Sequence, residues 1–127
     1  MIIHRRDVTP LLLLADNNNL NHIEQLLLLS KYSPVVAKSS NEVMQYLRGK
    51  ECATIFIDCE TAATIGLGIL SKFKVANPAC RVVMICSREH KEHRGIIREA
   101  FERGIYSCLL APFEDWEVLT MVEFYHL

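Results

Sequence analysis

Short apolar runs alternate along the chain with stretches whose apolar residues recur every three or four positions. The runs predict buried strands, and the stretches predict amphipathic helices. Five such pairs follow one another within the 127 residues. This alternation is typical of a parallel sheet covered by helices on both faces. We therefore expect one α/β domain with a five-stranded parallel sheet.

The expected strands are short and rich in aliphatic and β-branched residues. They cover residues 11–15, 34–37, 54–57, 81–86 and 106–110. The third run carries no charged side chain, which predicts a central strand that is covered on both faces. It ends at Asp58.

The first two expected helices begin at residues that cap a helix N-terminus. Residues 17–19, all asparagine, offer side-chain oxygens to a helix whose apolar positions are Leu20, Ile23, Leu26 and Leu27. Ser39 and Glu42 form the sequence pattern of a capping box for the second helix, which is expected to end at Gly49.

The three later helices are recognised by apolar spacing and by their stop signals. A loop is expected after Asp58, followed by a helix from Gly66 that stops before Pro78. The next helix ends at Gly104, and its apolar stripe contains Ile96, Ile97, Ala100 and Phe101. The last helix begins with two acids, Glu114 and Asp115, and is expected to run to the C-terminus.

Length and composition set the broad class of protein. One domain over 1–127, with its core at about 11–125, matches the usual size of a single core. The leucine runs at 11–14 and 26–29 are far shorter than the ~20 residues of a membrane helix, and no export signal is visible, so we expect a cytoplasmic protein that contacts no membrane. The net charge of −1 argues against direct binding of nucleic acid.

Cysteine and histidine are the residues that most often build disulfides and zinc sites. The five cysteines are Cys52, Cys59, Cys80, Cys86 and Cys108, and none forms a C-x-x-C pair. We predict free thiols, with Cys59 a neutral thiol in a loop. His90 and His93 are three positions apart, but no third ligand is visible, so we expect both to be solvated.

Two acids follow expected strands. Asp16 ends the first strand and Asp58 ends the third. Because the carboxyl ends of parallel strands meet at one edge of a sheet, the two carboxylates are expected to lie side by side, where they could hold Mg²⁺. Three alternatives remain: Asp16 caps the first helix, Asp58 is a plain loop residue, or the two acids form the acid/base pair of an enzyme, which would need a deep pocket.

Three stretches of the chain resemble the response-regulator receiver family of two-component signalling. DCETAATIGLGIL resembles the segment from the phospho-acceptor aspartate, NPACRVVMICS the fourth strand, and REAFERGIYSCLLAPF the following helix, glycine, fifth strand and proline-phenylalanine. The resemblance extends from Leu11 to about Phe124. It implies a three-layer, flavodoxin-like (βα)5 fold with strand order 2-1-3-4-5.

The resemblance also implies roles for individual residues. Asp58 takes the place of the phosphorylated aspartate, and Cys86 that of the hydroxyl residue that contacts the phosphoryl group, with Ser87 one step further as a substitute. The implied Mg²⁺ ligands are Asp16, Asp58 and the backbone carbonyl of Glu60. The chain departs from the family at Ala15 (usually a second acid), Ala62 (a proline), Cys108 (an aromatic switch residue) and Ala111 (a lysine).

These departures predict an atypical receiver with weak Mg²⁺ binding. Loss of one preorganised electrostatic group typically costs ~2.7–4 kcal/mol in catalytic sites, and Ala111 removes a cation. Ala15 removes an anionic ligand. Arg88 or Lys91 could lean back to replace the lysine, although such charges are usually solvated.

We expect a non-enzymatic signalling domain that accepts a phosphoryl group at Asp58 from a sensor histidine kinase or phosphotransfer protein, within a longer regulator that carries an output domain. The alternative is a phosphorylation-independent interaction module. Opposite charges on the last two helices suggest a homodimer face, with intramolecular or solvated charge as the competing interpretation. The charged residues are Arg88, Lys91, Arg94, Arg98 and Arg103, facing Glu114, Asp115, Glu117 and Glu123.

Overall fold

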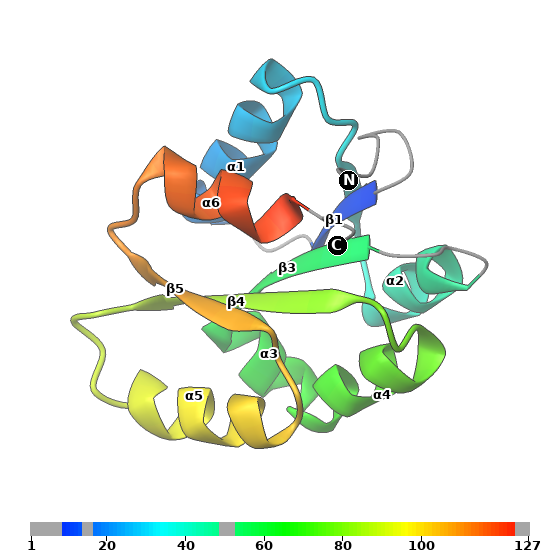
Figure 1. The fold of residues 1–127 in the computed structure, drawn as a ribbon. Helices are drawn as coiled ribbons and strands as arrows, with labels where there is room; N and C mark the ends of the chain where they lie inside the picture. Colours follow the sequence, from blue (N-terminus) through cyan, green and yellow to red (C-terminus); the bar gives the residue numbers. More distant parts are fainter. Residues whose placement is uncertain (1–8, 14–16, 49–52, 124–127) are drawn as a thin grey trace, which may run out of the picture.

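The computed structural model describes residues 9–13, 17–48 and 53–123. Five parallel strands form one sheet in the order β2-β1-β3-β4-β5 (Figure 1). Their bounds are β1 Thr9–Leu13, β2 Val35–Ala37, β3 Ala53–Asp58, β4 Arg81–Ser87 and β5 Ser107–Ala111. All six residues of β3 are buried, as the uncharged run at 54–57 predicts for a central strand.

Helices cover both faces of the sheet (Figure 1). Their bounds are α1 Asn18–Leu29, α2 Ser40–Leu47, α3 Cys59–Ile65, α4 Gly68–Ala76, α5 His93–Glu102 and α6 Asp115–Val122. Leu27 of α1 and Val118 of α6 belong to the core on one face. Leu47 of α2 and Phe73 of α4 belong to the core on the other face, together with α3 and α5. The predicted α/β class is confirmed, and three layers are present.

Local signals place several helix ends correctly. The Oδ1 of Asn17 accepts hydrogen bonds from the backbone N–H groups of Asn19 and Leu20, at 2.7 and 3.3 Å, and so caps α1. Ser39 caps α2, whereas the Glu42 side chain accepts from Lys38 rather than from Ser39. Gly104 adopts a positive φ of 93° after α5.

Two sequence expectations about local structure are wrong. Asp58 is followed directly by helix α3 instead of a loop. The apolar spacing missed this helix because its buried residues, Cys59 and Ala62, are too small to form a visible stripe. Phe101 is 50% exposed, since it lies one position beyond the buried Ala100 and therefore about 100° around the helix.

The ends of the chain also differ from expectation. The first strand begins at Thr9, and its expected end at residues 14–15 lies outside the described residues, as does Gly49. The last helix ends at Val122. None of the described helices has the length and apolar character needed to cross a membrane.

Two described cysteines, Cys80 and Cys108, are free thiols. Burial raises the pKa of Cys80, and it raises the pKa of Cys108 to about 11. The thiolate form of either residue is therefore suppressed at neutral pH. Cys52 lies outside the described residues.

Replacing Phe73 with alanine tests the packing of the core beneath α4. Phe73 is fully buried, so Phe73→Ala should lower the free energy of unfolding by about 3–5 kcal/mol in urea titrations. The control is Phe101→Ala, which should cost about 0.5 kcal/mol because that ring is half exposed. Equal losses for the two variants would contradict the observed burial.

The raised pKa of Cys108 makes a second prediction. Alkylation of Cys108 by iodoacetamide should accelerate roughly tenfold per pH unit from pH 8 to 10, because only the thiolate reacts and the pKa is about 11. Mass spectrometry of the peptide that contains Cys108 measures the rate. An alkylation rate that levels off at pH 9 would contradict the raised pKa of Cys108.

Candidate functional site

A pocket of about 160 Å³ lies at the carboxyl ends of β3 and β4. The parallel pairing of these strands sets Asp58 opposite Ile85, so Cys86 and Ser87 follow at the same edge. The residues that line the pocket are Asn17, Asn19, Asp58, Cys59, Glu60, Ile85, Cys86, Ser87, His90 and His93. The structure therefore brings together the predicted site residues Asp58, Glu60, Cys86 and Ser87.

Asp58 is the buried acid of this pocket. It is only 6% exposed, and its Oδ2 accepts a 3.4 Å hydrogen bond from the backbone N–H of Thr61, which makes Asp58 the N-cap of α3. The loop expected after Asp58 left no helix for this residue to cap. Oδ1 is buried and has no hydrogen-bond partner among the described residues. A buried carboxylate oxygen without a partner is costly, so the site is suited to an added cation or donor.

The predicted Mg²⁺ ligands are only partly visible. Asp16 lies outside the described residues, so its expected approach to Asp58 is not seen. The unpartnered Oδ1 of Asp58, with Glu60 beside it in the pocket lining, provides the hard oxygen donors that Mg²⁺ prefers. Asn17 also lines the pocket, but its Oδ1 is occupied by the N-terminus of α1.

The most unexpected feature of the pocket is a disulfide between Cys59 and Cys86. Cys59 opens α3 immediately after Asp58, and Cys86 stands near the end of β4, with a Cα–Cα distance of 5.3 Å. The predictions of free thiols and of a neutral Cys59 loop thiol are wrong for this pair. Sequence spacing could not reveal the pair, because the two cysteines are 27 positions apart and only the β3–β4 pairing brings them together.

The two histidines do not share one environment. His93 is 6% exposed, so the expectation that it is solvated is wrong, whereas His90 is exposed as expected. The backbone N–H of Ser87 donates a 3.0 Å hydrogen bond to Nδ1 of His93. Nε2 of a neutral His93 therefore carries the hydrogen, and it lies 3.4 Å from Nδ1 of His90.

Within the described part of the chain, two sets of residues have the mutual distances of a metal site. One is Cys59, Cys86 and His93, and the other is Glu60, His90 and His93, each with its ligand atoms within 4.8 Å of one another. In the second set, Glu60 of α3 is the third ligand for His90 and His93 that the spacing along the chain does not show. The hydrogen bond from Ser87 engages the lone pair on Nδ1 of His93, which disfavours that ring as a ligand in its observed orientation.

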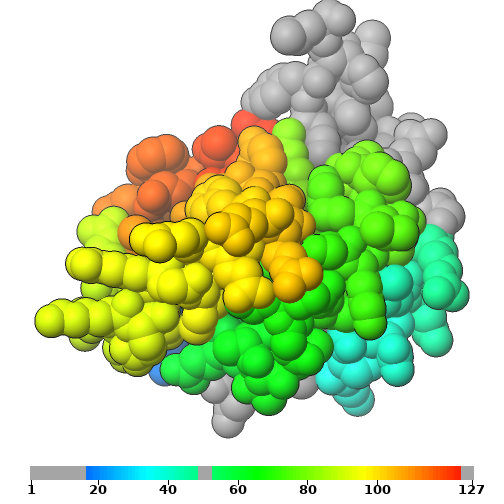
Figure 2. Space-filling view, turned by 90° about the horizontal axis from the view of Figure 1, so that it is seen from below, coloured from blue at the N-terminus to red at the C-terminus, as the bar shows by residue number. Residues whose placement is uncertain are grey.

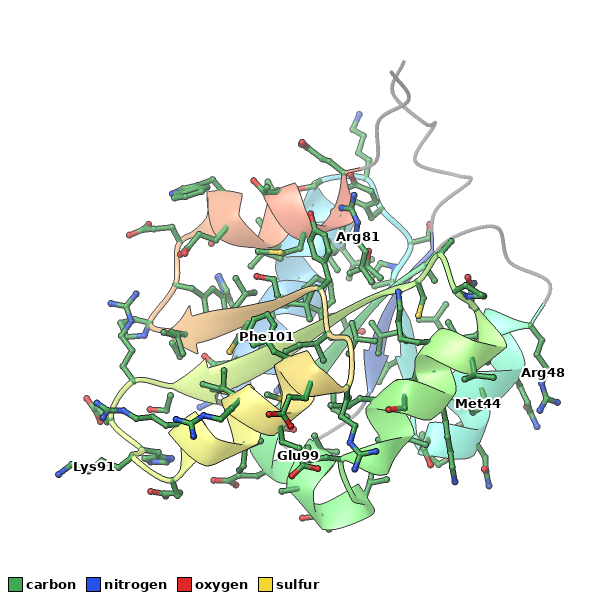
Figure 3. The ribbon with its side chains drawn as sticks, turned by 60° about the horizontal axis from the view of Figure 1, so that its bottom comes forward. Met44, Arg48, Arg81, Lys91, Glu99 and Phe101 are labelled. Atoms are coloured by element: carbon green, nitrogen blue, oxygen red, sulfur yellow. A yellow bond between two sulfur atoms is a disulfide. The ribbon has the colours of Figure 1, made fainter. Side chains whose placement is uncertain are left out.

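No lysine or arginine is among the described residues that line the pocket. Ala111 pairs with Ser87 across β4 and β5, where the resemblance places a lysine. Arg88 and Lys91 are exposed, and Lys91 extends away from the body of the domain (Figure 3). Neither residue lines the pocket as a replacement cation.

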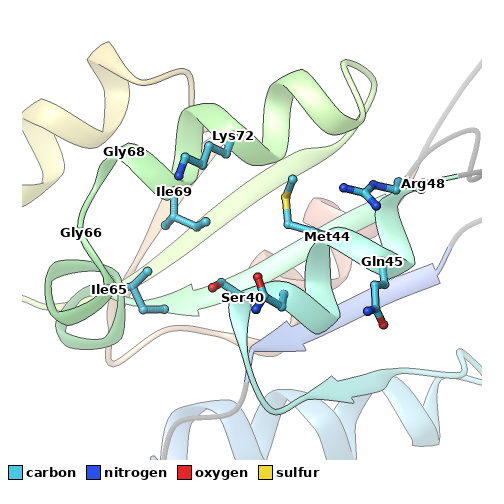
Figure 4. Close-up of a pocket in the computed structure, with 10 residues that line it drawn as sticks. Ser40, Met44, Gln45, Arg48, Ile65, Gly66, Gly68, Ile69 and Lys72 are labelled. Atoms are coloured by element: carbon cyan, nitrogen blue, oxygen red, sulfur yellow. The ribbon is translucent and has the colours of Figure 1, made fainter.

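A larger cavity, of about 650 Å³, lies between α2 and α4 (Figure 4). Its charged lining residues are Arg48 and Lys72. Its described lining residues include no aspartate, glutamate, histidine or cysteine, so they offer no carboxylate to accept a phosphoryl group or to bind a metal ion. Chemical character therefore favours the smaller pocket around Asp58 as the functional site.

The charged residues of the expected dimer face occupy the surface near α5 and α6. Figure 2 shows the side chains that follow β4 and begin α5 projecting from one side of the domain, in yellow. Arg103 pairs with Glu99 within one protomer, at 3.3 Å, and Asp115 pairs with His22 of α1, at 3.0 Å. Some of the charged side chains expected to pair between two protomers are thus paired within one chain.

Comparison with solved structures identifies the fold. A response regulator from Thermotoga maritima superposes with a TM-score of 0.69 at 17% identity, over 88% of this chain and 91% of that one. A Burkholderia pseudomallei response regulator with a phosphorylated aspartic acid and a calcium ion gives 0.68 at 14% identity, over 91% and 65%. The receiver domain of the Pseudomonas aeruginosa sensor kinase PA1611, with magnesium in its active-site cleft, gives 0.64 at 15%, over 90% and 93%.

Comparison of sequences gives no further assignment. No protein-family model matches the chain, and no curated protein matches it. The structural matches confirm the prediction made from the sequence motifs: the chain has the fold of response-regulator receiver domains.

Proposed function

We propose that this domain is an atypical receiver that accepts a phosphoryl group on Asp58 from a sensor histidine kinase or a phosphotransfer protein. The observation that carries the proposal is the buried Oδ1 of Asp58, which has no hydrogen-bond partner within the described structure and lies in a pocket at the carboxyl edge of the sheet. The role is in signalling, and the proposed setting is a longer regulator with an output domain.

In the proposed reaction, a carboxylate oxygen of Asp58 attacks the phosphorus of the donor, and the donor's leaving group departs with the electrons of the broken bond. Ser87 accepts from the N–H of Glu89 through Oγ, which leaves its hydroxyl hydrogen able to donate to a phosphoryl oxygen. A Cys86 thiol would supply a weaker donor when the disulfide is reduced. Mg²⁺, when bound by Asp16, Asp58 and the carbonyl of Glu60, supplies charge neutralisation.

The pocket is poorly equipped to stabilise the product. An aspartyl phosphate carries about two negative charges, and none of the described lining residues is a lysine or an arginine. We therefore propose that the phosphorylated form is short-lived and weakly coupled to structural change.

A second candidate function is a phosphorylation-independent interaction module. Large apolar side chains remain exposed around α5, β5 and α6, namely Phe101, Tyr106, Leu110 and Trp116. Such residues are enriched at protein interfaces. In this proposal the surface binds a partner or a second copy of the chain, whatever the state of Asp58.

Phosphorylation of Asp58 can be measured directly. The reduced protein, incubated with acetyl phosphate and Mg²⁺, should gain the mass of one phosphoryl group, and Asp58→Asn should not. Glu60→Gln is the matched control, because it keeps the backbone carbonyl proposed as a ligand. If the wild type gains no mass and Asp58→Asn behaves identically, the interaction module becomes the better account.

Restoring the missing cation tests the role of position 111. Ala111→Lys should raise the rate or extent of phosphorylation by acetyl phosphate by roughly tenfold or more, because a preorganised cation stabilises the developing charge. Ala111→Met, which adds length without charge, is the control. Equal effects of the two substitutions would exclude the electrostatic explanation.

A further inference from the structure

The Cys59–Cys86 pair occupies the same pocket as the proposed phosphoryl acceptor. Cys59 follows Asp58 directly, and its backbone is part of the first turn of α3 that Asp58 caps. Cys86 follows Ile85, which is the pairing partner of Asp58 in β4. The disulfide therefore joins the two backbone segments that flank the acceptor carboxylate.

We propose that Cys59 and Cys86 form a reversible redox site, oxidised by a peroxide, whose disulfide blocks phosphoryl acceptance at Asp58. The block of phosphoryl acceptance rests on the proposed function, whereas the reversible oxidation of the two cysteines does not. The site is a modification site for a small oxidant rather than a structural crosslink.

Position within the fold favours a reversible role. A structural disulfide stabilises mainly by restricting the unfolded chain, and it can do so from any part of a domain. This one lies instead in the lining of a pocket that also contains Asp58 and His93. Both residues are nearly buried, with Cys59 1% and Cys86 2% exposed, so the pocket of about 160 Å³ that they line is the route by which a small oxidant would reach their sulfurs.

A peroxide would oxidise the thiols of Cys59 and Cys86 to the disulfide in two steps. One thiolate attacks a peroxide oxygen: an S–O bond forms, the O–O bond breaks, and the leaving oxygen takes a proton. The second thiolate then attacks the resulting sulfenic sulfur, an S–S bond forms, and the S–O bond breaks to release water. With hydrogen peroxide, the two thiols lose two electrons and two protons in total, and two waters form. A dithiol such as dithiothreitol reverses the change and becomes a disulfide itself.

Oxidation changes the surroundings of Asp58 in two ways. The Cys86 sulfur loses its hydrogen, so it can no longer donate to an oxygen in the pocket. The bond also fixes the start of α3 to the end of β4, which restricts the segments that would have to adjust around an added phosphoryl group. The reduced pair leaves both segments free and restores a weak donor.

A metal ion held by Cys59, Cys86 and His93 is the main competing interpretation. These residues have suitable mutual distances. The N–H of Ser87, however, donates to Nδ1 of His93, so the ring would have to turn or lose a proton to bind a metal. The observed arrangement pairs the two sulfurs with each other instead.

The first part of the test concerns the thiols alone. Hydrogen peroxide should remove two titratable thiols, dithiothreitol should restore them, and peptide mapping should locate the bond between Cys59 and Cys86. Cys86→Ser and Cys59→Ala should each abolish the bond, whereas Cys108→Ser, which removes a free thiol of β5, should not. Failure to form the bond, or zinc retained by reduced protein with thiols that resist peroxide, would overturn the proposal.

The second part compares phosphorylation of the oxidised and reduced forms by acetyl phosphate. The oxidised wild type should be phosphorylated at least tenfold less than the reduced form, and Cys86→Ser and Cys59→Ala should show no difference after peroxide treatment. Equal phosphorylation of both forms would overturn the block at Asp58. If the bond forms reversibly but neither form is phosphorylated, the redox site stands and the proposed function fails.

Discussion

Parallel pairing of β3 with β4 is the constraint from which the site follows. The register sets Asp58 opposite Ile85, and the complete burial of β3 holds that register because a slip of one residue would reverse every side chain. The carboxylate of Asp58 and the sulfurs of Cys59 and Cys86 consequently meet at one edge of the sheet, although the two cysteines are 27 positions apart in the sequence. Each proposal about this protein depends on that meeting.

Much of the fold could be predicted because its signals are local. Asn17, Ser39 and Gly104 mark helix ends through their own backbone and side-chain chemistry, and the uncharged third strand indicates its burial. Helix α3 could not be predicted in this way, since its small buried residues give no apolar period. The disulfide and the burial of His93 depend on contacts across the sheet edge, which spacing along the chain does not report.

The sequence predicted the position of the candidate site better than its chemical character. The ends of β3 and β4 do bring Asp58, Cys86 and Ser87 to one pocket. The chemistry there differs from the expected receiver pattern, because sulfur stands where a hydroxyl is usual and Ala111 offers no charge. Among the described residues, one buried oxygen of Asp58 has no hydrogen-bond partner and the pocket lining has no lysine or arginine, so in the proposed function the site would need added charge to hold a phosphoryl group.

The central claim is that the reduced pocket accommodates a phosphoryl group bonded to Asp58. Fluorine NMR of the reduced protein with beryllofluoride, a mimic of that group, and Mg²⁺ tests it without requiring a kinase. The account predicts resonances of bound beryllofluoride for the wild type that disappear in Asp58→Asn. Spectra that show only free fluoride species for both proteins would contradict it.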